Sequence, residues 1–162
     1  MKKRLTLLQM DVHVNDVEYN YNRVQELLTQ SLTENPDIIV LPETWNTGFH
    51  PSDDLITIAD RNGERTKSLL TAFAKEHNVN IVGGSVAVAK DDLVFNTSYA
   101  YNREGTLVGE YSKMHGFSPA KEDKYFASGT HTTHFKLDGI PCSTVICYDI
   151  RFPELVRMAA LP

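Results

Sequence analysis

The residues DIIVLPE, numbers 37–43, give the clearest signal for the fold, because four apolar residues run without interruption to a proline and a glutamate. Such a short apolar run is typical of a strand that is covered on both faces. The preceding pair Asn35-Pro36 marks the end of a helix, since proline disfavours helical geometry in the residue ahead of it. We therefore predict a buried strand that follows a helix and delivers Glu43 to its end.

Periodic patterns on both sides of this strand indicate an α/β protein. Residues 5–10 read as a first strand, and residues 17–32 carry apolar positions at helical spacing, with Asn15 and Glu18 as a predicted capping pair. Residues 63–77 form a second helical pattern. A strand-helix-strand order favours right-handed crossovers and places functional groups at strand ends.

The second half of the chain changes to hairpin patterns. A β-rich run at residues 79–89 is interrupted by Gly83-Gly84, which suggests a bulge or a close approach of backbone. Residues 94–111 and 134–146 read as two hairpins, the latter turning at Asp138-Gly139 and leading directly into Cys147. The polar stretch 112–131 carries no expected strand or helix, and loops of that length are usually functional. Together, these patterns predict a mixed α/β sheet with helices on at least one face.

Composition narrows the class of protein. The 162 residues are 41% hydrophobic and 23% charged, as expected of one soluble domain. A formal net charge of -5 makes nucleic acid an unsuitable partner. Two cysteines do not make a disulfide-rich scaffold, and the apolar stretches are too short for a signal peptide or a membrane span. We expect a cytoplasmic protein without membrane contact.

Three polar residues of complementary chemistry follow predicted strands: Glu43, Lys113 and Cys147. Taken singly, Glu43 is more simply explained as a loop carboxylate, Lys113 as a solvated lysine and Cys147 as a small core residue. A base, a cation and a thiol together are the groups required for acyl transfer through a covalent thioester. The combination predicts a catalytic site.

Cys142 and the histidine pair at residues 131 and 134 have simpler interpretations. Cys142 is predicted on the same strand as Cys147, about 16 Å away, whereas a disulfide requires α-carbons within roughly 7 Å. The two cysteines also lack C-x-x-C spacing, and the histidines have no acidic or cysteine partner at ligand spacing. We expect no metal site.

Three stretches resemble the Glu, Lys and Cys motifs of the nitrilase superfamily, the carbon-nitrogen hydrolases: VLPETWNTGF at 40–49, YSKMHGF at 111–117 and ICYDIRFPEL at 146–155. Their order and separation match as well. The nearest likeness is to the bacterial ω-amidase-like branch, which acts on ω-amides of 2-oxo acids such as 2-oxoglutaramate. The resemblance implies that residues 1–162 form the N-terminal portion of a four-layer α-β-β-α sandwich, a carbon-nitrogen hydrolase domain that is incomplete at its C-terminus.

The resemblance also implies roles for individual residues. Cys147 would be the nucleophile and Glu43 the general base. Lys113, with the backbone N–H of Tyr148, would stabilise the oxyanion, and Glu122 would orient Lys113 and the substrate. No cofactor is implied. Gly116 departs from the pattern, because relatives more often carry a larger apolar residue there.

Further residues are candidates for substrate binding. An arginine fork suits a carboxylate, so Arg151 could contact the substrate, or it could pair with Glu154. Trp45 and Phe49 are expected at the pocket mouth, although core packing explains them almost as well. Tyr148 completes the candidate set.

Two classes of function remain open at this stage. One is a thiol amidohydrolase that converts a small carboxylate-bearing amide to acid and ammonia. The other is an inactive truncated fragment or non-enzymatic half-domain that keeps the catalytic residues without a complete pocket. An acyltransferase or a glutamine-hydrolysing subunit is a weaker alternative. Unpaired sheet edges favour association, so a homo-oligomer is the expected assembly, and the resemblance implies a dimer.

Overall fold

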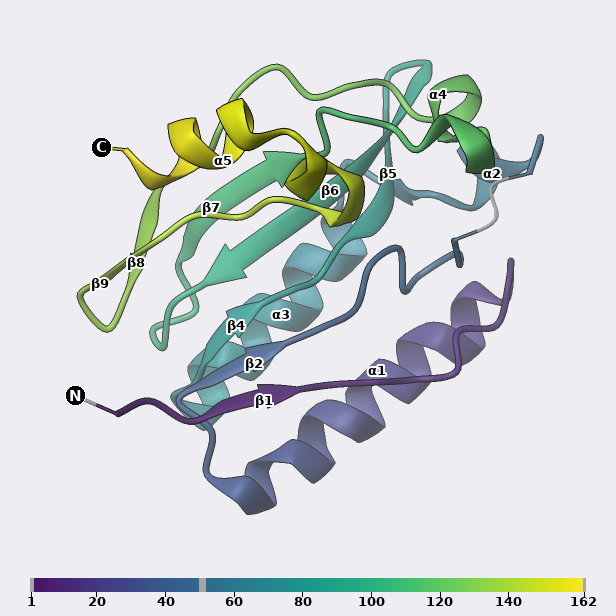
Figure 1. The fold of residues 1–162 in the computed structure, drawn as a ribbon. Helices are drawn as coiled ribbons and strands as arrows, with labels where there is room; N and C mark the ends of the chain where they lie inside the picture. Colours follow the sequence, from purple (N-terminus) through teal and green to yellow (C-terminus); the bar gives the residue numbers. More distant parts are fainter. Residues whose placement is uncertain (1, 50–51, 162) are drawn as a thin grey trace.

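A computed structural model describes residues 2–49 and 52–161 and shows a mixed α/β fold (Figure 1). The strands are β1 Leu5–Leu7, β2 Ile38–Val40, β3 Asp60–Arg61, β4 Asn80–Val82, β5 Val86–Lys90, β6 Leu93–Tyr101, β7 Leu107–Ser112, β8 Phe135–Leu137 and β9 Ile140–Cys142. The helices are α1 Val17–Ser31, α2 Leu55–Ile58, α3 Glu64–His77, α4 Glu122–Tyr125 and α5 Pro153–Ala160, with single 3₁₀ turns η1 Leu32–Glu34, η2 Ser118–Ala120 and η3 Cys147–Arg151.

The main sheet has the order β1-β2-β4-β6-β5-β3, and β7 also pairs with β6. Strands β1, β2 and β4 run parallel, and α1 and α3 make the connections between them. The predicted strand-helix-strand order is therefore confirmed. The long β6 pairs with β4 and β5 along one edge and with β7 along the other, which confirms the first predicted hairpin.

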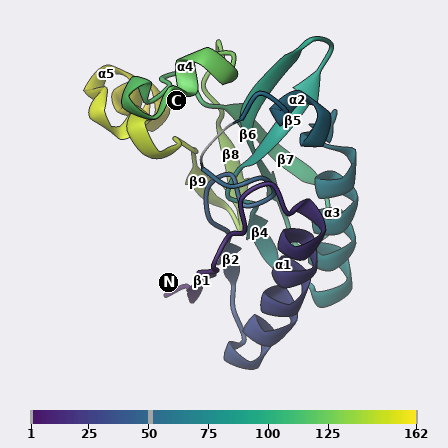
Figure 2. The same cartoon turned by 90° about the vertical axis from the view of Figure 1, so that its right-hand side faces the viewer.

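Both long helices cover the same face of this sheet (Figure 2). Apolar residues at helical spacing on α1 and α3 pack against alternate residues of the strands and form the largest core cluster. Its fully buried members include Val24 and Leu28 of α1, Leu70 of α3, Ile39 of β2 and Ile81 of β4. The helical spacing seen in the sequence thus identifies the face that is buried.

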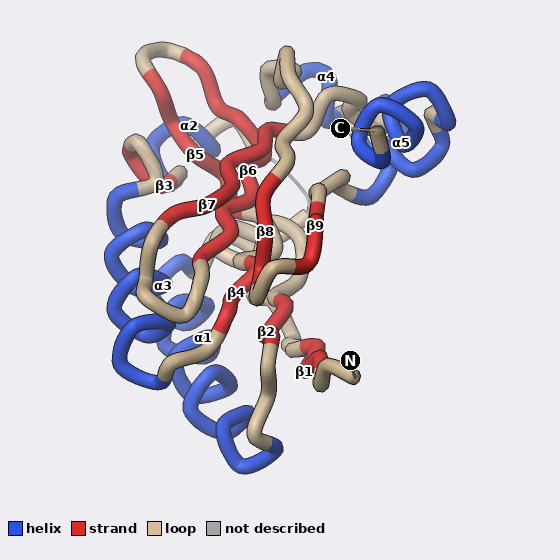
Figure 3. Tube along the Cα trace, turned by 90° about the vertical axis from the view of Figure 1, so that its left-hand side faces the viewer, coloured by secondary structure: helices blue, strands red, loops and turns tan. Residues whose placement is uncertain are grey.

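The β8–β9 hairpin lies against the other face of the sheet (Figure 3). Phe135 and Leu137 of β8 pack with Ile38 of β2 and Ala100 of β6. Beyond the hairpin, β1 is uncovered on this face, where Leu5 and Leu7 are 56% and 66% exposed. No helix among the described residues has the length and apolar character needed to cross a membrane.

Three local predictions require correction. The N-cap of α1 is Asp16, whose carboxylate accepts the Tyr19 N–H at 3.1 Å, whereas Asn15 adopts a left-handed conformation and bonds through its backbone to Thr47. The stretch 112–131 contains the short helices η2 and α4. Finally, the second hairpin is shorter than predicted.

The strand predicted at residues 141–146 ends at Cys142. Residues 143–146 belong to no strand. The Ser143 hydroxyl donates to the Thr133 carbonyl, and the Ile146 N–H donates to the Asp149 carboxylate. Cys147 therefore begins a 3₁₀ turn and shares no strand with Cys142. Both cysteines are free thiols.

Candidate active site

The ammonium group of Lys113 connects two glutamates that are distant in sequence. Its Nζ lies 2.8 Å from Oε1 of Glu43 and 3.0 and 2.8 Å from the two oxygens of Glu122. The Lys113 side chain is 3% exposed and that of Glu122 is 2% exposed, whereas Glu43 keeps 22% of its side-chain surface. Of the three groups, Glu43 is the one that is open to a reactant.

Glu43 is positioned by a tight contact between two chain segments that follow β2 and β4. The Pro42 carbonyl accepts the Ser85 N–H at 3.0 Å, and the Ser85 hydroxyl accepts the Thr44 N–H at 3.1 Å. A Cβ at Gly84 would lie 1.9 Å from that same Pro42 oxygen. The predicted close backbone approach at Gly83-Gly84 is therefore confirmed, and it fixes the segment that carries the glutamate.

Hydrogen bonds with backbone groups hold both Lys113 and Glu122. Lys113 follows β7, and its N–H donates to the Asn96 carbonyl at 2.9 Å while its own carbonyl accepts the Gly129 N–H. Glu122 begins α4 and accepts the Phe117 N–H at 2.6 Å. The loop between these residues thus folds back so that the buried carboxylate meets the buried ammonium.

The charged state of Lys113 is stabilised by its surroundings. Burial on its own lowers the pKa of this lysine, but the hydrogen bonds and negative charges of Glu122 and Glu43 outweigh it, and the pKa of Lys113 lies above its ordinary value. A lysine buried without such partners would tend to lose its proton. The two carboxylates therefore keep a cation inside a site with little solvent.

Cys147 lies beside this charged cluster at the start of η3. Burial raises the pKa of its thiol, the negative charge of Glu43 and a hydrogen bond with that carboxylate raise it further, and Lys113 acts in the opposite direction. The thiol is therefore protonated at neutral pH. A reaction that uses the thiolate needs a base in contact with Cys147, and Glu43 is in that place.

The backbone at the site is strained at two positions. Cys147 has φ 48° and Thr44, next to Glu43, has φ 43°, both in the left-handed region that residues other than glycine seldom adopt. Such conformations persist where the surrounding structure imposes them, and they concentrate at functional sites. Both unusual conformations lie on segments that carry candidate catalytic residues, Glu43 on one and Cys147 on the other.

A second buried carboxylate, Asp149, ties the nucleophile turn to the lysine segment. Its Oδ2 accepts the Tyr111 hydroxyl at 2.7 Å and the Ile146 N–H at 3.1 Å, and its Oδ1 accepts the His115 N–H at 2.9 Å. The Nδ1 atom of His115 is also 2.9 Å from Oδ1. Sequence reasoning missed this network, although its members stand two residues from Lys113 and from Cys147.

Aromatic rings pack around the 3₁₀ turn η3, which begins at Cys147. His115 stacks on Phe152, with ring centroids 3.6 Å apart. Tyr148 meets Phe117 and Phe152 edge to face, at 5.1 and 5.6 Å. These contacts hold the Tyr148 ring beside the turn, and its role in the site stays a prediction.

Trp45 does not lie at the pocket mouth, and that expectation is corrected. Its side chain has no exposed surface, its Nε1 donates to the Gly83 carbonyl at 2.9 Å, and its ring packs on Tyr21 in the helix-covered core. Arg151 is exposed, and within the described residues it makes no ion pair, with Glu154 or any other acid.

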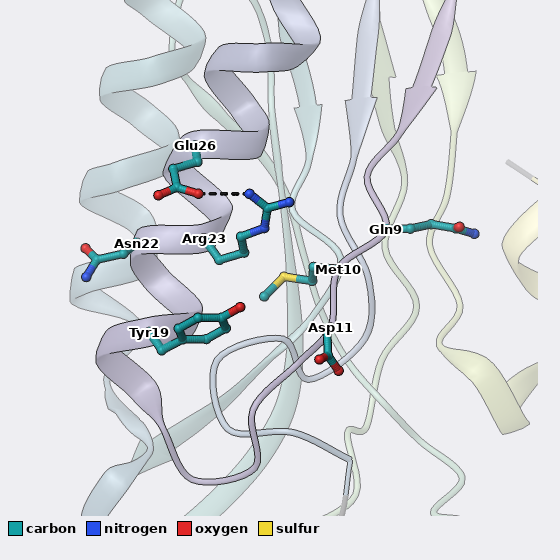
Figure 4. A pocket seen from close by; sticks show the side chains of 7 residues that line it. All are labelled: Gln9, Met10, Asp11, Tyr19, Asn22, Arg23 and Glu26. Carbon is teal, nitrogen blue, oxygen red and sulfur yellow. Dashed lines mark hydrogen bonds and ion pairs between the residues drawn. The ribbon is translucent and has the colours of Figure 1, made fainter.

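A surface hollow lies away from the charged cluster, between the segment after β1 and α1 (Figure 4). It has a volume of about 480 Å³ and is lined by Met10, Tyr19 and the ion pair Arg23–Glu26, among others. None of the residues that line it belongs to the charged cluster. Next to Lys113 and Glu122 the structure leaves a cavity of only about 10 Å³.

Comparison with known proteins identifies relatives along almost the whole chain. The family model described as "Carbon-nitrogen hydrolase" matches residues 4–162. The chain is 40% identical over 157 residues to the 2-oxoglutaramate amidase of Bacillus subtilis, covering 97% of this chain and 60% of that protein. It is 27% identical over 172 residues to the chloroplastic omega-amidase of Arabidopsis thaliana, covering 98% of this chain and 46% of that protein.

Solved structures show the same fold. A CN-hydrolase superfamily protein from Xanthomonas campestris superposes with a TM-score of 0.83 at 28% identity, over 94% of this chain and 56% of that chain. An amidase from Nesterenkonia sp. superposes with a TM-score of 0.84 at 22% identity, over 98% and 60%. The chain spans about 60% of the length of the bacterial amidase that it matches. Because the family model matches nearly the whole chain, the chain belongs to the carbon-nitrogen hydrolase family.

Proposed function

We propose that the protein carrying this chain is a thiol amidase, which hydrolyses a carbon-nitrogen bond through a Cys147 thioester. The observation that carries the proposal is the juxtaposition of a protonated thiol, an accessible carboxylate and a buried ammonium. A base, a nucleophile and an electrostatic stabiliser in mutual contact are what acyl transfer requires. Residues 1–162 would be part of one catalytic domain.

In the first half of the proposed reaction, Glu43 accepts the Cys147 proton as the sulfur attacks the amide carbonyl carbon. The carbonyl oxygen becomes an oxyanion, which the Lys113 ammonium and the Tyr148 backbone N–H stabilise. The proton on Glu43 then passes to the amide nitrogen, the C–N bond breaks, and ammonia leaves. A thioester between the acyl group and Cys147 remains.

In the second half, Glu43 accepts a proton from water as the water oxygen attacks the thioester carbonyl. The same donors stabilise the second oxyanion. The C–S bond breaks, the acid leaves, and the Glu43 proton returns to the sulfur. Glu122 takes no part in proton transfer: it holds the Lys113 ammonium through two short contacts. All groups in this sequence are protein side chains or backbone, so the proposal requires no cofactor.

We propose a short dicarboxylic monoamide with a free 2-oxo acid end, such as 2-oxoglutaramate, as the substrate. Support comes from the 40% identity to a 2-oxoglutaramate amidase and from the exposed, unpaired Arg151 four residues after the nucleophile. A protein of formal charge -5 does not attract an anion by its overall field, so a local cation must do so. Arginine binds a carboxylate in a fork geometry.

The chemistry is tested by replacing Cys147 with alanine and using Cys142→Ala as the matched control. Ammonia release from 2-oxoglutaramate is measured with both variants of the protein that carries this chain, and intact-mass analysis follows the acyl adduct. We expect no turnover and no adduct for Cys147→Ala, and both for Cys142→Ala. An alanine variant that kept a tenth of the wild-type rate would exclude a Cys147 thioester.

The substrate is tested by comparing kcat/KM for 2-oxoglutaramate, glutamine, butyramide and a simple nitrile. We expect 2-oxoglutaramate to be preferred, and we expect Arg151→Gln to reduce that preference. Equal efficiency on butyramide would exclude a carboxylate site while leaving the thioester chemistry intact.

We also propose that the protein acts as a homodimer in the cytoplasm, where a nucleophilic thiol stays reduced. Exposed apolar residues on η3, on α5 and directly after α5 support an interface between copies: Ile150, Met158 and Leu161 are more than half exposed. Light scattering at several concentrations measures the mass. A concentration-independent monomer would contradict the proposed assembly.

A further inference from the structure

Asn96 touches both members of the Glu43–Lys113 pair. It lies within β6 and is 1% exposed. Its Nδ2 donates to Oε1 of Glu43 at 3.0 Å, and its backbone carbonyl accepts the Lys113 N–H at 2.9 Å. One buried residue therefore sets the position of the carboxylate through its side chain and of the lysine through its backbone.

The Lys113 ammonium and the Asn96 amide donate hydrogen bonds to the same oxygen of Glu43. Lys113 Nζ is 2.8 Å from Oε1, and Asn96 Nδ2 is 3.0 Å from that same atom. In the part of the chain that the structure describes, no lysine, amide or backbone N–H donates to Oε2. An oxygen that accepts two hydrogen bonds is less able to take up a proton than one that accepts none.

We propose that Asn96 is a positioning residue that makes Oε2 of Glu43 the proton-accepting oxygen. This inference rests on the proposed role of Glu43 as the base. With Oε1 held by two donors, the carboxylate cannot rotate, and Oε2 is the oxygen that receives the Cys147 proton. Without Asn96, Lys113 alone would hold Oε1, and the carboxylate could turn about that single contact.

The surroundings of the Asn96 amide support this reading. Its Oδ1 atom is buried and has no hydrogen-bond partner among the described residues. The amide borders the cavity of about 10 Å³ that Lys113 and Glu122 also line, a space close to that of one water molecule. Turning the amide over would bring Oδ1 against the Glu43 carboxylate, so the donor must face Glu43. The hydrogen bond from Nδ2 to Glu43 therefore accounts for an amide whose Oδ1 has no partner.

Two substitutions separate this role from general packing. Asn96→Asp keeps the shape of the side chain and replaces the donor with a second carboxylate beside Glu43, whereas Asn96→Ser removes the donor without adding charge. Both changes favour the protonated form of Glu43, through like-charge repulsion in the first and loss of a hydrogen bond in the second. The acidic limb of the kcat/KM profile against pH should therefore move to higher pH, further for Asp than for Ser.

Ser98→Ala is the matched control. Ser98 lies two residues along the same strand, on the same face by the alternation of β6, and it is 2% exposed. Its hydroxyl makes no hydrogen bond with any described residue. Replacing it perturbs the packing of β6 without removing a contact to Glu43, so the pH profile should match that of the wild type.

The experiment measures pH profiles of kcat/KM for 2-oxoglutaramate hydrolysis with the protein that carries this chain, after thermal melting has verified folding. We expect kcat at neutral pH to fall about tenfold or more for Asn96→Asp, with the displaced acidic limb. If Asn96→Asp does not fold, the Asn96→Ser profile decides. An unshifted limb in a folded Asn96 variant would overturn the assignment.

The same assay distinguishes this inference from the proposed function on which it rests. If Cys147→Ala is inactive and the Asn96 variants behave as the wild type, the thioester chemistry stands and Asn96 is only structural. If Glu43→Gln retains full turnover, Glu43 is not the base. In that case the proposed mechanism and the role of Asn96 fail together.

Discussion

Tyr111 and Asp149 are joined by a hydrogen bond of 2.7 Å between two buried side chains. Tyr111 precedes Lys113 by two residues, and Asp149 follows Cys147 by two. The bond therefore links the segment that carries the ammonium to the turn that carries the thiol. The relative placement of two reactive groups depends on a contact that includes neither of them.

Replacing Tyr111 with phenylalanine should weaken both stability and turnover. The change leaves a buried Asp149 oxygen without one of its donors, which costs about 1–3 kcal/mol. Because the Cys147 turn is then less firmly placed, kcat should fall more than KM rises. Chemical denaturation and steady-state kinetics measure the two effects. Tyr19→Phe, on the exposed side of α1, serves as the control and should leave both unchanged.

Lys113→Met should reduce the chemical step by about a hundredfold or more, because it removes a charge that faces the developing oxyanion. It also leaves the Glu43 and Glu122 carboxylates without their shared cation. Lys90→Met is the matched control, since Lys90 makes a similar 2.7 Å pair with Glu110 away from the site. A Lys113→Met variant with raised KM and normal kcat would make the lysine a substrate anchor instead.

Glu43→Gln should lower the pKa of the Cys147 thiol while it abolishes turnover. In the wild type, burial and then the negative charge of Glu43 raise that pKa. The neutral amide removes the second cause, and the positive charge of Lys113 remains to favour the thiolate. Alkylation of Cys147 by iodoacetamide, followed by peptide mass spectrometry across pH, should therefore begin at lower pH in the variant. An onset at higher pH would contradict the contact between these two side chains.

The ion cluster around Asp138 should make stability depend on pH in the acidic range. Hydrogen bonds from Arg103 and then Lys3 hold the pKa of Asp138 well below its usual value. The stabilisation is therefore complete above the unfolded pKa of about 4, and it is lost as pH falls through the lower folded value.

The expected contribution of Asp138 is about 1 kcal/mol, because the cluster is partly open to solvent. Urea denaturation from pH 7 to pH 2 compares the wild type with Asp138→Asn. The difference in unfolding free energy should be largest at pH 7 and shrink toward pH 2. Asp123→Asn, at an exposed position, is the control and should show no such convergence.

Periodicity explains which parts of the fold could be predicted from the sequence. The strand at Ile38–Val40 and the helices α1 and α3 rest on apolar spacing, which burial against one sheet face imposes directly. The apolar residues before Cys147 misled the prediction, because an irregular apolar segment and a strand can have the same composition. Only the hydrogen bonds distinguish them, and Asp149 supplies one of these bonds.

Contacts across the fold explain what the sequence could not predict at the site. Trp45 lies two residues after Glu43, yet the strained backbone at Thr44 turns the two side chains apart, one to the site and one to the core. Asn96 and Asp149 act through partners 53 and up to 38 positions away. No local sequence pattern predicts contacts between residues so far apart in the chain. The roles of Glu43, Lys113, Glu122 and Cys147 came instead from resemblance, and they stay predictions until the variants are measured.

The left-handed backbone at Cys147 also sets a cost that the fold must meet before any chemistry takes place. A residue other than glycine in this conformation costs on the order of 1–3 kcal/mol, and Thr44, at φ 43°, adds a second such residue on the segment that carries Glu43. The local sequence therefore does not favour the geometry of the site on its own. Tertiary contacts impose it, so the site forms only when the surrounding fold does.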